Sequence, residues 1–412
     1  MEFKTISVVG LGYIGLPTAA VIASRGLQVI GLDVSEHAVK TINEGNVHIV
    51  EPDLDIVVRS VVNSGNLKAT LTAEKADAFM VAVPTPFKDD YKADLSYIES
   101  AAKTIAPVLE KGNLVILEST SPVGATEEMA KWLAEARPDL SFPQQNASNP
   151  DINIAHCPER VLPGHVLREL VENDRVIGGM SPACSERAVA LYKTFVKGEC
   201  LITNARTAEM AKLTENSFRD VNIAFANELS LICDKLDINV WELIKLANRH
   251  PRVNILNPGP GVGGHCIAVD PWFIVSSAPE EAKLIKQARL VNDAKPEYVF
   301  NQIIKEADEF KRPVVACFGL AFKADIDDLR ESPALDIAVK LAKQEGLEVL
   351  VVEPNIDALP NVFEGTNAKL VSVEQAFEEA KVMAILVDHS EFKNVDAEKW
   401  AAKVVIDSRG IV

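Results

Sequence analysis

Short runs of β-branched and other apolar residues alternate with amphipathic stretches over roughly the first half of the chain. Such alternation of strand-like and helix-like periodicity is typical of a parallel sheet whose strands are joined by crossover helices. A helix is predicted over residues 16–24, and a surface loop rich in Gln, Asn and Ser over residues 143–150. The predicted strands are residues 6–9, 28–32, 78–83, 114–117, 152–156 and 175–178.

The pattern changes near Thr207, where a long stretch without proline or glycine predicts one helix over residues 208–240. Thr207 can serve as its N-cap, and Glu209 suits the first turn of a helix. A second helix is expected over residues 282–310, kinked or divided by Pro296. A helix as long as the first usually forms the spine of a linking domain, and often a dimer interface.

Strand-like runs return after Pro313, at residues 314–319, 348–352, 382–387 and 404–407. Here Ser332 followed by Pro333 is typical of the N-cap and first position of a helix, which is expected to continue through Lys343. We therefore predict an α/β protein with two doubly wound Rossmann-like domains, joined by a central helical domain that contains a long helix. The predicted domains are residues 1–205, 206–311 and 312–412. Two α/β domains that flank a helical one are expected to form a cleft.

The composition narrows the class of protein. The chain has 412 residues, which is too long for a single hydrophobic core and predicts more than one domain. Its 42 Lys and Arg residues against 59 Asp and Glu residues give a net charge of −17. Such acidity argues against nucleic acid or an anionic membrane as a partner. The six cysteines are scattered without a C-x-x-C pair, so neither a metal site nor a disulfide framework is expected. Because no signal peptide and no run of ~20 apolar residues is visible, we expect a cytoplasmic protein that does not enter a membrane.

A glycine fingerprint follows the first predicted strand, with Gly10, Gly12 and Gly15 in the spacing G-x-G-x-x-G. The first two glycines permit a tight turn and the close approach of a pyrophosphate, and the third lets the helix pack on the strand. Asp33 ends the next predicted strand, where a carboxylate can bond the ribose hydroxyls of NAD and would repel the 2′-phosphate of NADP. We therefore expect NAD as the cofactor. The competing interpretation is a purely structural glycine turn.

Hydroxyl and carboxyl side chains follow other predicted strands. Ligands of open α/β sheets bind at the carboxyl ends of the strands, so Thr85 and Thr126 can contact the cofactor, and Thr120 can orient water or substrate. Turn capping is an equally strong interpretation for such hydroxyls. Glu159, which follows the predicted strand at 152–156, is a candidate base that activates water.

Lys212, Asn216, Arg219 and Ile223 recur at helical spacing, so they share one face of the long helix. The lysine and the amide on this face can bind an oxyanion or move a proton, although a solvated helix face is the simpler interpretation of this stretch alone. A positive cluster at residues 249–252, Arg-His-Pro-Arg, can bind a pyrophosphate or another anion. Its competing interpretation is a charge cluster at the end of a helix.

The stretch from residue 259 to residue 270 is the most informative in the chain. Its four glycines, at positions 259, 261, 263 and 264, allow backbone conformations that approach a bulky ligand closely. Cys266 and Asp270 follow, so the loop can hold a thiol nucleophile against that ligand; the alternative is a buried structural thiol. A dinucleotide site and a nucleophile in one chain predict oxidation of an alcohol through the aldehyde to an acid. The reason is that hydride can leave an aldehyde only after a nucleophile has added to it.

Taken together, these motifs resemble the UDP-glucose/GDP-mannose dehydrogenase family from end to end. The resemblance rests on the fingerprint at 10–15, Pro-Glu-Arg at 158–160, Lys212 with Asn216, Gly-Gly-His-Cys at 263–266 and Gly-Leu-Ala-Phe-Lys at 319–323. Members that oxidise UDP-N-acetyl-D-mannosamine agree closely with this chain at residues 51–54, 249–256 and 327–333. UDP-glucose enzymes usually carry an apolar residue where this chain has Arg160, which favours an N-acetylated sugar.

The resemblance implies a UDP-sugar 6-dehydrogenase that uses two NAD⁺ and one water per turnover, with UDP-N-acetyl-D-mannosamine as the expected substrate. UDP-glucose or another UDP-hexose is the alternative substrate, and a two-electron hydroxyacid dehydrogenase is the alternative activity. Members are commonly homodimers built on the long helix. By position, the cofactor contacts beside the three fingerprint glycines would be Tyr13, Ile14, Asp33, Thr85, Thr126 and Arg330. The substrate contacts would be Arg160, Val161, Lys212, Asn216, Arg219, His250, Arg252, Gly263, Phe322 and Lys323.

The same resemblance implies a catalytic set of Cys266, Lys212, Asn216, Asp270, Glu159 and Thr120. In the first oxidation, Lys212 or Asp270 would take the proton of the sugar 6-hydroxyl. The Cys266 thiolate would then add to the aldehyde while Lys212 and Asn216 stabilise the oxyanion, and a second oxidation would give a thioester. Water aligned by Thr120 or Glu159 would release the acid.

Overall fold

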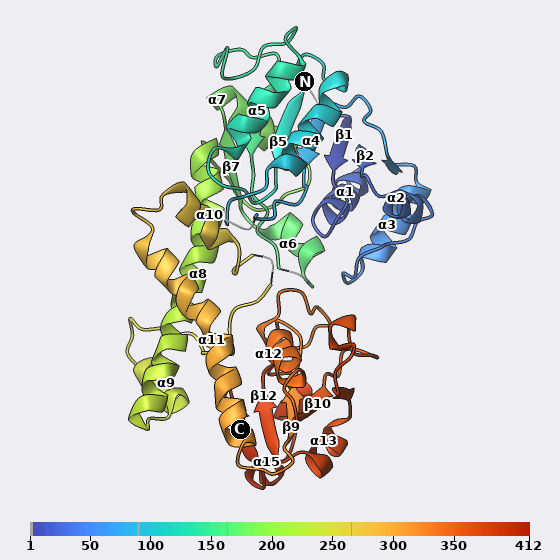
Figure 1. Cartoon of the computed structure of the whole chain (residues 1–412). Helices are drawn as coiled ribbons and strands as arrows, with labels where there is room; N and C mark the ends of the chain where they lie inside the picture. The colour runs from blue at the N-terminus through green and yellow to red at the C-terminus, as the bar shows by residue number, and fades with distance from the viewer. Residues whose placement is uncertain (1–2, 89–90, 163, 265) are drawn as a thin grey trace. The chain divides into compact units, whose positions relative to one another are not determined.

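The computed structural model describes residues 3–88, 91–162, 164–264 and 266–412. They belong to two compact units, Met1–Glu215 and Asn216–Val412. Helix α8 (Ala205–Leu236) is continuous across the boundary between these units (Figure 1). The two boundaries expected between three domains, at residues 205 and 311, stay a prediction.

The first unit is built on an eight-stranded sheet in the order β3-β2-β1-β4-β5-β6-β7-β8. Its neighbouring strands are parallel except β6 and β7, which are antiparallel, so the prediction of a parallel sheet is wrong at this pair. A strand antiparallel to its predecessor starts at the end of the sheet where the predecessor stopped. The connection between β6 and β7 therefore begins and ends on the side of the sheet where β6 stops. The strands are β1 (Thr5–Val9), β2 (Gln28–Leu32), β3 (Leu67–Thr70), β4 (Ala78–Val81), β5 (Leu114–Leu117), β6 (Asn153–His156), β7 (Arg175–Gly179) and β8 (Cys200–Asn204).

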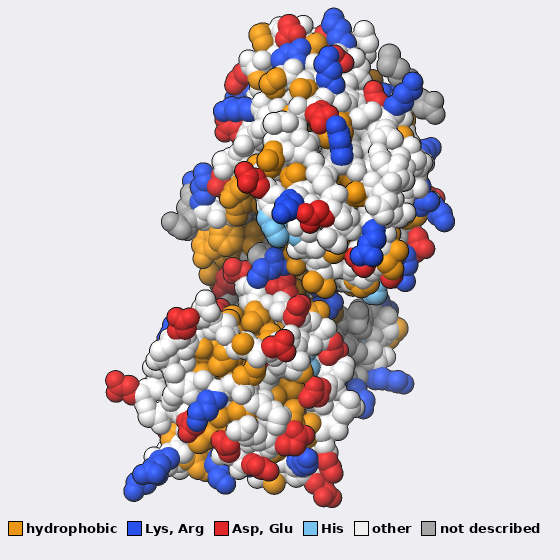
Figure 2. Space-filling view, turned by 90° about the vertical axis from the view of Figure 1, so that its right-hand side faces the viewer, with side chains coloured by type: hydrophobic (Ala, Val, Ile, Leu, Met, Phe, Trp, Pro, Cys, Tyr) orange, Lys and Arg blue, Asp and Glu red, His pale blue; other side chains and the backbone are white. Residues whose placement is uncertain are grey.

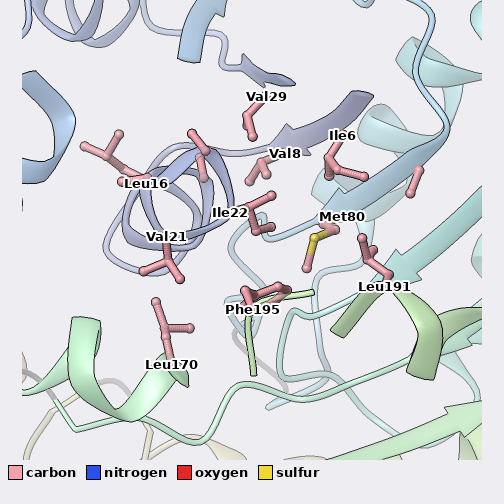
Figure 3. Packing of buried hydrophobic residues seen from close by; sticks show 14 of the residues in the cluster. Ile6, Val8, Leu16, Val21, Ile22, Val29, Met80, Leu170, Leu191 and Phe195 are labelled. Atoms are coloured by element: carbon pink, nitrogen blue, oxygen red, sulfur yellow. The ribbon is translucent and has the colours of Figure 1, made fainter. Parts of the chain in front are cut away.

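Helices cover both faces of this sheet, which is the doubly wound arrangement. On one face, Ile22 of α1 belongs to the same buried cluster as Val8 of β1 and Met80 of β4 (Figure 3). On the other face, Met129 of α5 belongs to a cluster with Phe79 of β4. The helices of this unit are α1 (Gly15–Ser24), α2 (Glu36–Asn43), α3 (Leu54–Asn63), α4 (Ser96–Ile105), α5 (Ala125–Ala136), α6 (Val166–Glu172) and α7 (Pro182–Tyr192), with a 3-10 turn η1 at Ala106–Val108.

The second unit contains a five-stranded parallel sheet in the order β11-β10-β9-β12-β13. The chain enters at the central strand β9, proceeds to one side through β10 and β11, and then crosses to the other side at β12. The strand order therefore reverses at the carboxyl end of β9, where open α/β sheets bind ligands. The strands are β9 (Val314–Phe318), β10 (Glu348–Val352), β11 (Lys369–Leu370), β12 (Val382–Ile385) and β13 (Val404–Asp407).

Alternate residues of β9 enter two different cores, as the pleat of a strand requires. Val315 packs with residues of α11 and α12, including Ile303 and Ile337. Phe318 packs on the opposite face with residues of α13 and α15, including Trp400. The helices of this unit beyond α8 are α9 (Val240–Ala247), α10 (Asp270–Ser277), α11 (Lys283–Ala307), α12 (Pro333–Ala342), α13 (Val373–Glu379), α14 (Ser390–Lys393) and α15 (Ala397–Ala401), with a 3-10 turn η2 at Asn361–Phe363.

The long predicted helix is shorter than expected at its C-terminal end. Helix α8 ends at Leu236 because Asp237 takes a positive φ of 57° and the side chain of Asn239 caps a new helix, α9. At the other end, the side chain of Asn204 accepts a hydrogen bond from Thr207 N–H, so Asn204 and not Thr207 is the cap. Local side-chain bonds to the backbone thus set both ends of the helix.

Helix α11 runs through Pro296 as one element, so of the two expected effects the division is wrong, and the kink stays a prediction. Its buried face continues on both sides of the proline and contacts α8, which lies beside it (Figure 1). Asn292 pairs with Asn227 at 2.8 Å, and Lys295 Nζ donates to Ser230 Oγ at 2.6 Å. These tertiary contacts outweigh the one backbone hydrogen bond that a proline removes.

The fold class predicted from the sequence is confirmed: two doubly wound α/β units, with helices α8 to α11 between the two sheets in the sequence. Three strands were not predicted, namely β3, β8 and β11. Each lies at an edge of its sheet, and β8 exposes Leu201 and Ile202, so no run of buried apolar residues marks it. By contrast, Ser332 caps α12 and Pro333 is its first residue, as predicted.

The surface carries both signs of charge. Figure 2 shows one face on which Lys and Arg side chains are interspersed with Asp and Glu side chains. Within the described residues, no helix combines the length and the apolar character that a membrane span requires. No cluster of three or more His, Cys, Asp or Glu side chains suited to a metal ion occurs in the same part of the chain.

Candidate active site

The glycine fingerprint forms the turn between β1 and α1, and each glycine meets a different physical requirement. Gly10 has a positive φ of 90°, and its N–H donates to the Leu32 carbonyl at 2.8 Å. A Cβ at Gly15 would lie 1.7 Å from the Gly10 carbonyl oxygen, so only glycine lets α1 begin this close to β1. A Cβ at Gly12 would meet nothing within 4 Å, so there is open space in front of the turn. This cradle fits the pyrophosphate of a dinucleotide.

Asp33 lies directly after β2, and its half-buried carboxylate connects two loops at the carboxyl edge of the sheet. Its Oδ2 accepts a hydrogen bond from Leu11 N–H at 2.7 Å, and its Oδ1 accepts one from Ser35 N–H at 2.8 Å. This position and charge are those of an acid that selects NAD over NADP. Tyr13 and Ile14 flank the start of α1, where Tyr13 is exposed and Ile14 half-buried. Their contacts with NAD stay predictions.

Two strand-end hydroxyls are buried without a hydrogen-bond partner in the described part of the chain. They belong to Thr85, after β4, and to Ser121, after β5. Buried polar atoms in proteins are almost always satisfied. Two orphaned hydroxyls at the carboxyl edge of a doubly wound sheet therefore fit a ligand at this edge. Thr120, next to Ser121, is half-buried and follows β5 as predicted.

Thr126 has a protein partner that the sequence did not indicate. It is fully buried in the first turn of α5, and its hydroxyl donates to Glu209 Oε1 at 2.6 Å. The N–H groups of Gly124 and Thr126 donate to the same carboxylate at 2.7 and 2.8 Å. Glu209 of α8 therefore caps α5, and burial raises its pKa. The Thr126 hydroxyl is committed to this bond, and its contact with NAD stays a prediction.

Glu159, the candidate water-activating base, is held in a buried ion pair. Both of its carboxylate oxygens accept hydrogen bonds from Arg175 Nη1, at 2.8 and 3.0 Å, and Oε1 also accepts one from Arg160 N–H at 2.6 Å. Arg175 is 1% exposed and Glu159 7% exposed. These contacts support a structural role for Glu159 more strongly than a base role.

A second carboxyl group, that of Glu118, lies near this pair and was not found from the sequence. It directly follows β5, and Tyr192 Oη donates to its Oε1 at 2.6 Å, while Oε2 is buried without a partner among the described residues. Burial, assisted by the charge of Glu159, raises the pKa of Glu118 to about 7 against the opposing effects of Tyr192 and Arg175. The available signal was a glutamate placed directly after a fully apolar strand, two residues before Thr120.

In the second unit, hydrogen bonds link three predicted catalytic residues: Asn216, Asp270 and Cys266. Asn216 of α8 donates from Nδ2 to Asp270 Oδ2 at 2.5 Å, and Asp270 is 4% exposed at the start of α10. The N–H of Asp270 donates to the Cys266 carbonyl at 2.9 Å, so Cys266 precedes α10 by one turn. Cys266 itself is exposed, not the buried structural thiol of the competing interpretation. Lys212, half-buried, lies one turn before Asn216 on the same face of α8.

The glycine loop before Cys266 packs against the loop after β9. A Cβ at Gly263 would lie 2.4 Å from the Glu331 carbonyl oxygen and 2.9 Å from the Phe322 Cβ. Gly264 has a positive φ of 82°, and a Cβ there would lie 3.1 Å from the Phe322 ring. These glycines therefore serve close packing of the two loops as well as access to the thiol. Residue 265 of the Gly-Gly-His-Cys motif lies outside the described residues.

The remaining predicted substrate and cofactor contacts are mostly exposed. The Arg160 guanidinium pairs with Glu215 of α8 at 2.7 Å, a partner that the sequence did not indicate. The Arg330 guanidinium donates two hydrogen bonds to Asp328, at 2.8 and 2.6 Å. Arg219, His250, Arg252 and Lys323 are exposed, whereas Val161, Gly263 and Phe322 are half-buried. Their binding roles stay predictions.

Comparison with known proteins gives one consistent result. Three domains of the UDP-glucose/GDP-mannose dehydrogenase family match the chain in order: the NAD binding domain at residues 4–196, the central domain at 206–294 and the UDP binding domain at 316–412. The UDP-N-acetyl-D-mannosamine dehydrogenase of Campylobacter jejuni is 66% identical over 400 residues, which are 97% of this chain and 98% of that one.

A second relative and a solved structure agree with this result. The NDP-N-acetyl-D-galactosaminuronic acid dehydrogenase of Ralstonia nicotianae is 64% identical over 411 residues, which are 100% of this chain and 97% of that one. The solved structure of the UDP-D-ManNAc dehydrogenase from Pyrococcus horikoshii superposes with a TM-score of 0.88 at 41% identity, covering 99% of this chain and 96% of that one.

The glycine cradle, the exposed thiol one turn before a buried carboxylate and the matches along the whole chain point to one enzyme class. NAD is the cofactor, and the reaction is the NAD-dependent oxidation of a UDP-sugar. The chain belongs to the UDP-glucose/GDP-mannose dehydrogenase family.

Proposed function

We propose that this protein oxidises UDP-N-acetyl-D-mannosamine at C6 to the uronate, in two oxidation steps that share one covalent intermediate on Cys266. The observation that carries the proposal is the exposed Cys266, one turn before a buried Asp270 that binds Asn216, in a chain with an NAD cradle. A dehydrogenase that stops at the aldehyde has no use for an exposed nucleophile at this place. An alcohol-to-acid oxidation requires one.

The NAD cradle of Gly10, Gly12 and Gly15, together with Asp33, would hold the dinucleotide, which accepts hydride when bound. The open space at Gly12 and the orphaned hydroxyl of Thr85 fit such a ligand. The remaining steps belong to the side chains of this protein. They must remove a proton from the sugar hydroxyl, add a nucleophile to the aldehyde and hydrolyse the thioester.

Asn216 and Asp270 support the nucleophilic step. The amide nitrogen of Asn216 carries two hydrogens, and the bond to Asp270 Oδ2 at 2.5 Å uses one of them. The other can donate to the oxyanion that forms when the Cys266 thiolate adds to the aldehyde, and Lys212 adds positive charge on the same helix face. Asp270 thus fixes the orientation of the amide. Lys212 and Asp270 both stay candidates for the proton acceptor of the first step.

Hydrolysis of the thioester requires an aligned water. Of the two candidates, Thr120 is half-buried at the carboxyl end of β5, whereas both carboxylate oxygens of Glu159 are bound by Arg175. We therefore propose Thr120 as the residue that aligns water. Glu159 and Arg175 would fix the loop that carries Arg160.

Arg160 is proposed to contribute to the choice of an N-acetylated sugar. Its guanidinium is oriented by Glu215, at 2.7 Å. A specific observation favours a second substrate: the relative from Ralstonia nicotianae, 64% identical, is named for N-acetyl-galactosaminuronic acid. The N-acetylated mannose and galactose differ in configuration at C2 and C4, so the same C6 chemistry applies to both.

We also propose a homodimer. Phe218, Phe225, Ile232 and Leu236 are exposed, and their spacing places them on one stripe of α8. Exposed apolar stripes of this kind usually mark protein–protein interfaces. A cytoplasmic location and a role in synthesis of enterobacterial common antigen or another surface polysaccharide stay predictions.

The proposal is tested by measuring how many molecules of NADH form per molecule of UDP-sugar consumed. Purified protein is given NAD⁺ and, separately, UDP-N-acetylmannosamine, UDP-N-acetylgalactosamine and UDP-glucose, and NADH formed is compared with sugar consumed. The proposal expects two NADH per molecule of UDP-N-acetylmannosamine and a higher kcat/KM for it than for the other two. One NADH per sugar would refute the covalent mechanism. A higher kcat/KM for UDP-N-acetylgalactosamine would move the substrate assignment to the second candidate.

A further inference from the structure

Glu353 and His389 form a fully buried pair in the second unit, at the carboxyl ends of β10 and β12, the two strands that flank β9. Glu353 directly follows β10 and is 3% exposed, and His389, which follows β12, is 0% exposed. His389 Nε2 lies 3.0 Å from Glu353 Oε2. Burying a carboxylate and an imidazole is unfavourable unless both are fully bonded. The hydrogen-bond partners of Glu353 and His389 therefore identify the part of the chain that the two side chains hold in place.

Among the described residues, the other bonds of Glu353 Oε2 go to the loop after β9. The N–H groups of Leu320 and Ala321 donate to it at 2.7 and 3.1 Å. Burial alone would raise the pKa of Glu353, but the bonds from His389 and from Leu320 N–H outweigh it and lower the pKa. The carboxylate is thus charged and anchors the first half of the loop.

His389 anchors the second half of the same loop. Asp325 N–H donates to His389 Nδ1 at 2.9 Å. A backbone N–H can only donate, so Nδ1 carries no proton and Nε2–H donates to Glu353. Asp325 itself takes a positive φ of 61°, and its carboxylate accepts bonds from Ser390 N–H and Ser390 Oγ at 2.8 and 2.6 Å. The pair therefore fixes both ends of residues 320–325.

The segment between these two anchors carries Phe322 and Lys323, the residues proposed to contact the UDP-sugar. Phe322 also packs against Gly263 and Gly264, which lead to Cys266. Phe322 N–H donates to the Asp328 carbonyl at 3.2 Å, and Ser390 bonds to the Asp325 carboxylate. The buried pair accepts the backbone N–H groups at both ends of the segment, those of Leu320, Ala321 and Asp325. An ordered loop binds a ligand more tightly than a mobile one, because less conformational entropy is lost on binding.

We propose that Glu353 and His389 are positioning residues of the UDP site, which hold Phe322 and Lys323 in the geometry that binds the nucleotide. This inference rests on the proposed function only in taking those two residues as UDP contacts. Neither Glu353 nor His389 needs to touch the ligand.

The bonds of His389 to Asp325 N–H and to Glu353 can be separated by two amide substitutions. Asn355 Nδ2 also lies 3.3 Å from His389 Nδ1. In His389→Asn, the side-chain oxygen can take the place of Nδ1 and accept from Asp325 N–H, while the donor to Glu353 is lost. In His389→Gln, the amide nitrogen can take the place of Nε2 and donate to Glu353, while the acceptor for Asp325 is lost. Ser390→Ala is a milder change at the surface that removes only the hydroxyl bond to Asp325.

Binding of UDP and, separately, of NAD⁺ is measured by calorimetry on the full chain, together with the thermal unfolding midpoint. We expect His389→Gln to weaken UDP binding by about ten-fold, the equivalent of one lost hydrogen bond. His389→Asn and Ser390→Ala should weaken it by less, about two- to three-fold. NAD⁺ binding, which belongs to the first unit, should stay within about two-fold of the wild type in all three.

Unchanged UDP affinity in His389→Gln and Ser390→Ala would overturn the inference. An equal loss of UDP and NAD⁺ affinity would also overturn it, because it would show general destabilisation. The outcome is independent of the proposed activity: a wild type that binds UDP but does not oxidise UDP-N-acetylmannosamine refutes the proposed function alone.

Discussion

Glu118 gives the sharpest test of the structure, because it is a buried carboxyl group with one oxygen unpaired among the described residues. Burial and the nearby charge of Glu159 raise the pKa of Glu118 from 4.5 to about 7. A raised pKa means that the folded protein prefers the protonated form. The contribution of protonated Glu118 to the stability of the fold is fully present below about pH 4.5, and it is lost as the pH rises through about 7.

The difference between the two pKa values corresponds to about 3 kcal/mol of folding free energy at alkaline pH. Glu118→Gln stays neutral at every pH and keeps an oxygen that can accept from Tyr192. Its buried amide nitrogen adds a cost that does not depend on pH. The stability of the variant relative to the wild type should therefore rise by about 2 kcal/mol between pH 5.5 and pH 8.5.

The measurement is urea unfolding at the two pH values, with amide hydrogen exchange in β5 reporting on the first unit. Tyr192→Phe is the matched control. It removes a hydrogen bond that lowers the pKa of Glu118, so it should increase the loss of stability at high pH. If the relative stability of Glu118→Gln is the same at both pH values, Glu118 is ionised in the fold and the reasoning is wrong.

Three further predictions concern the proposed function. Cys266→Ser should slow formation of the acid by at least about a hundred-fold, because a hydroxyl is a far weaker nucleophile than a thiolate; a near wild-type rate, with mass spectrometry showing no covalent sugar, would make the thiol dispensable. Asp33→Ala should shift the ratio of kcat/KM values for NAD⁺ and NADP⁺ by about ten-fold toward NADP⁺, and wild-type enzyme that already prefers NADP⁺ would contradict the role of Asp33. Phe225→Asp should weaken the proposed dimer at least about ten-fold in sedimentation experiments, whereas Glu228→Gln, at another exposed position of α8, should leave it unchanged; equal oligomeric states for both variants would place the interface elsewhere.

Local rules explain why much of this protein could be predicted from its sequence. The spacing of Gly10, Gly12 and Gly15 predicted a cradle that the geometry explains atom by atom, because the need for glycine is a backbone property. Apolar runs such as β2 and β5 were found at their observed bounds, since central strands are buried on both faces. Ser332 and Pro333 marked the start of α12 through capping, which is also local. The exposed Cys266 was expected from the glycine loop before it.

Tertiary structure decided the rest, where a residue's partner lies far along the chain. The antiparallel pairing of β6 with β7 depends on the path of a connection, and the apolar patterns of the two strands do not contain it. The ion pair of Glu159 and the bond between Thr126 and Glu209 join residues 16 and 83 positions apart. Periodicity identifies a buried face but not what a polar group on it will meet, because a hydrogen bond depends on which elements the fold brings within about 3 Å.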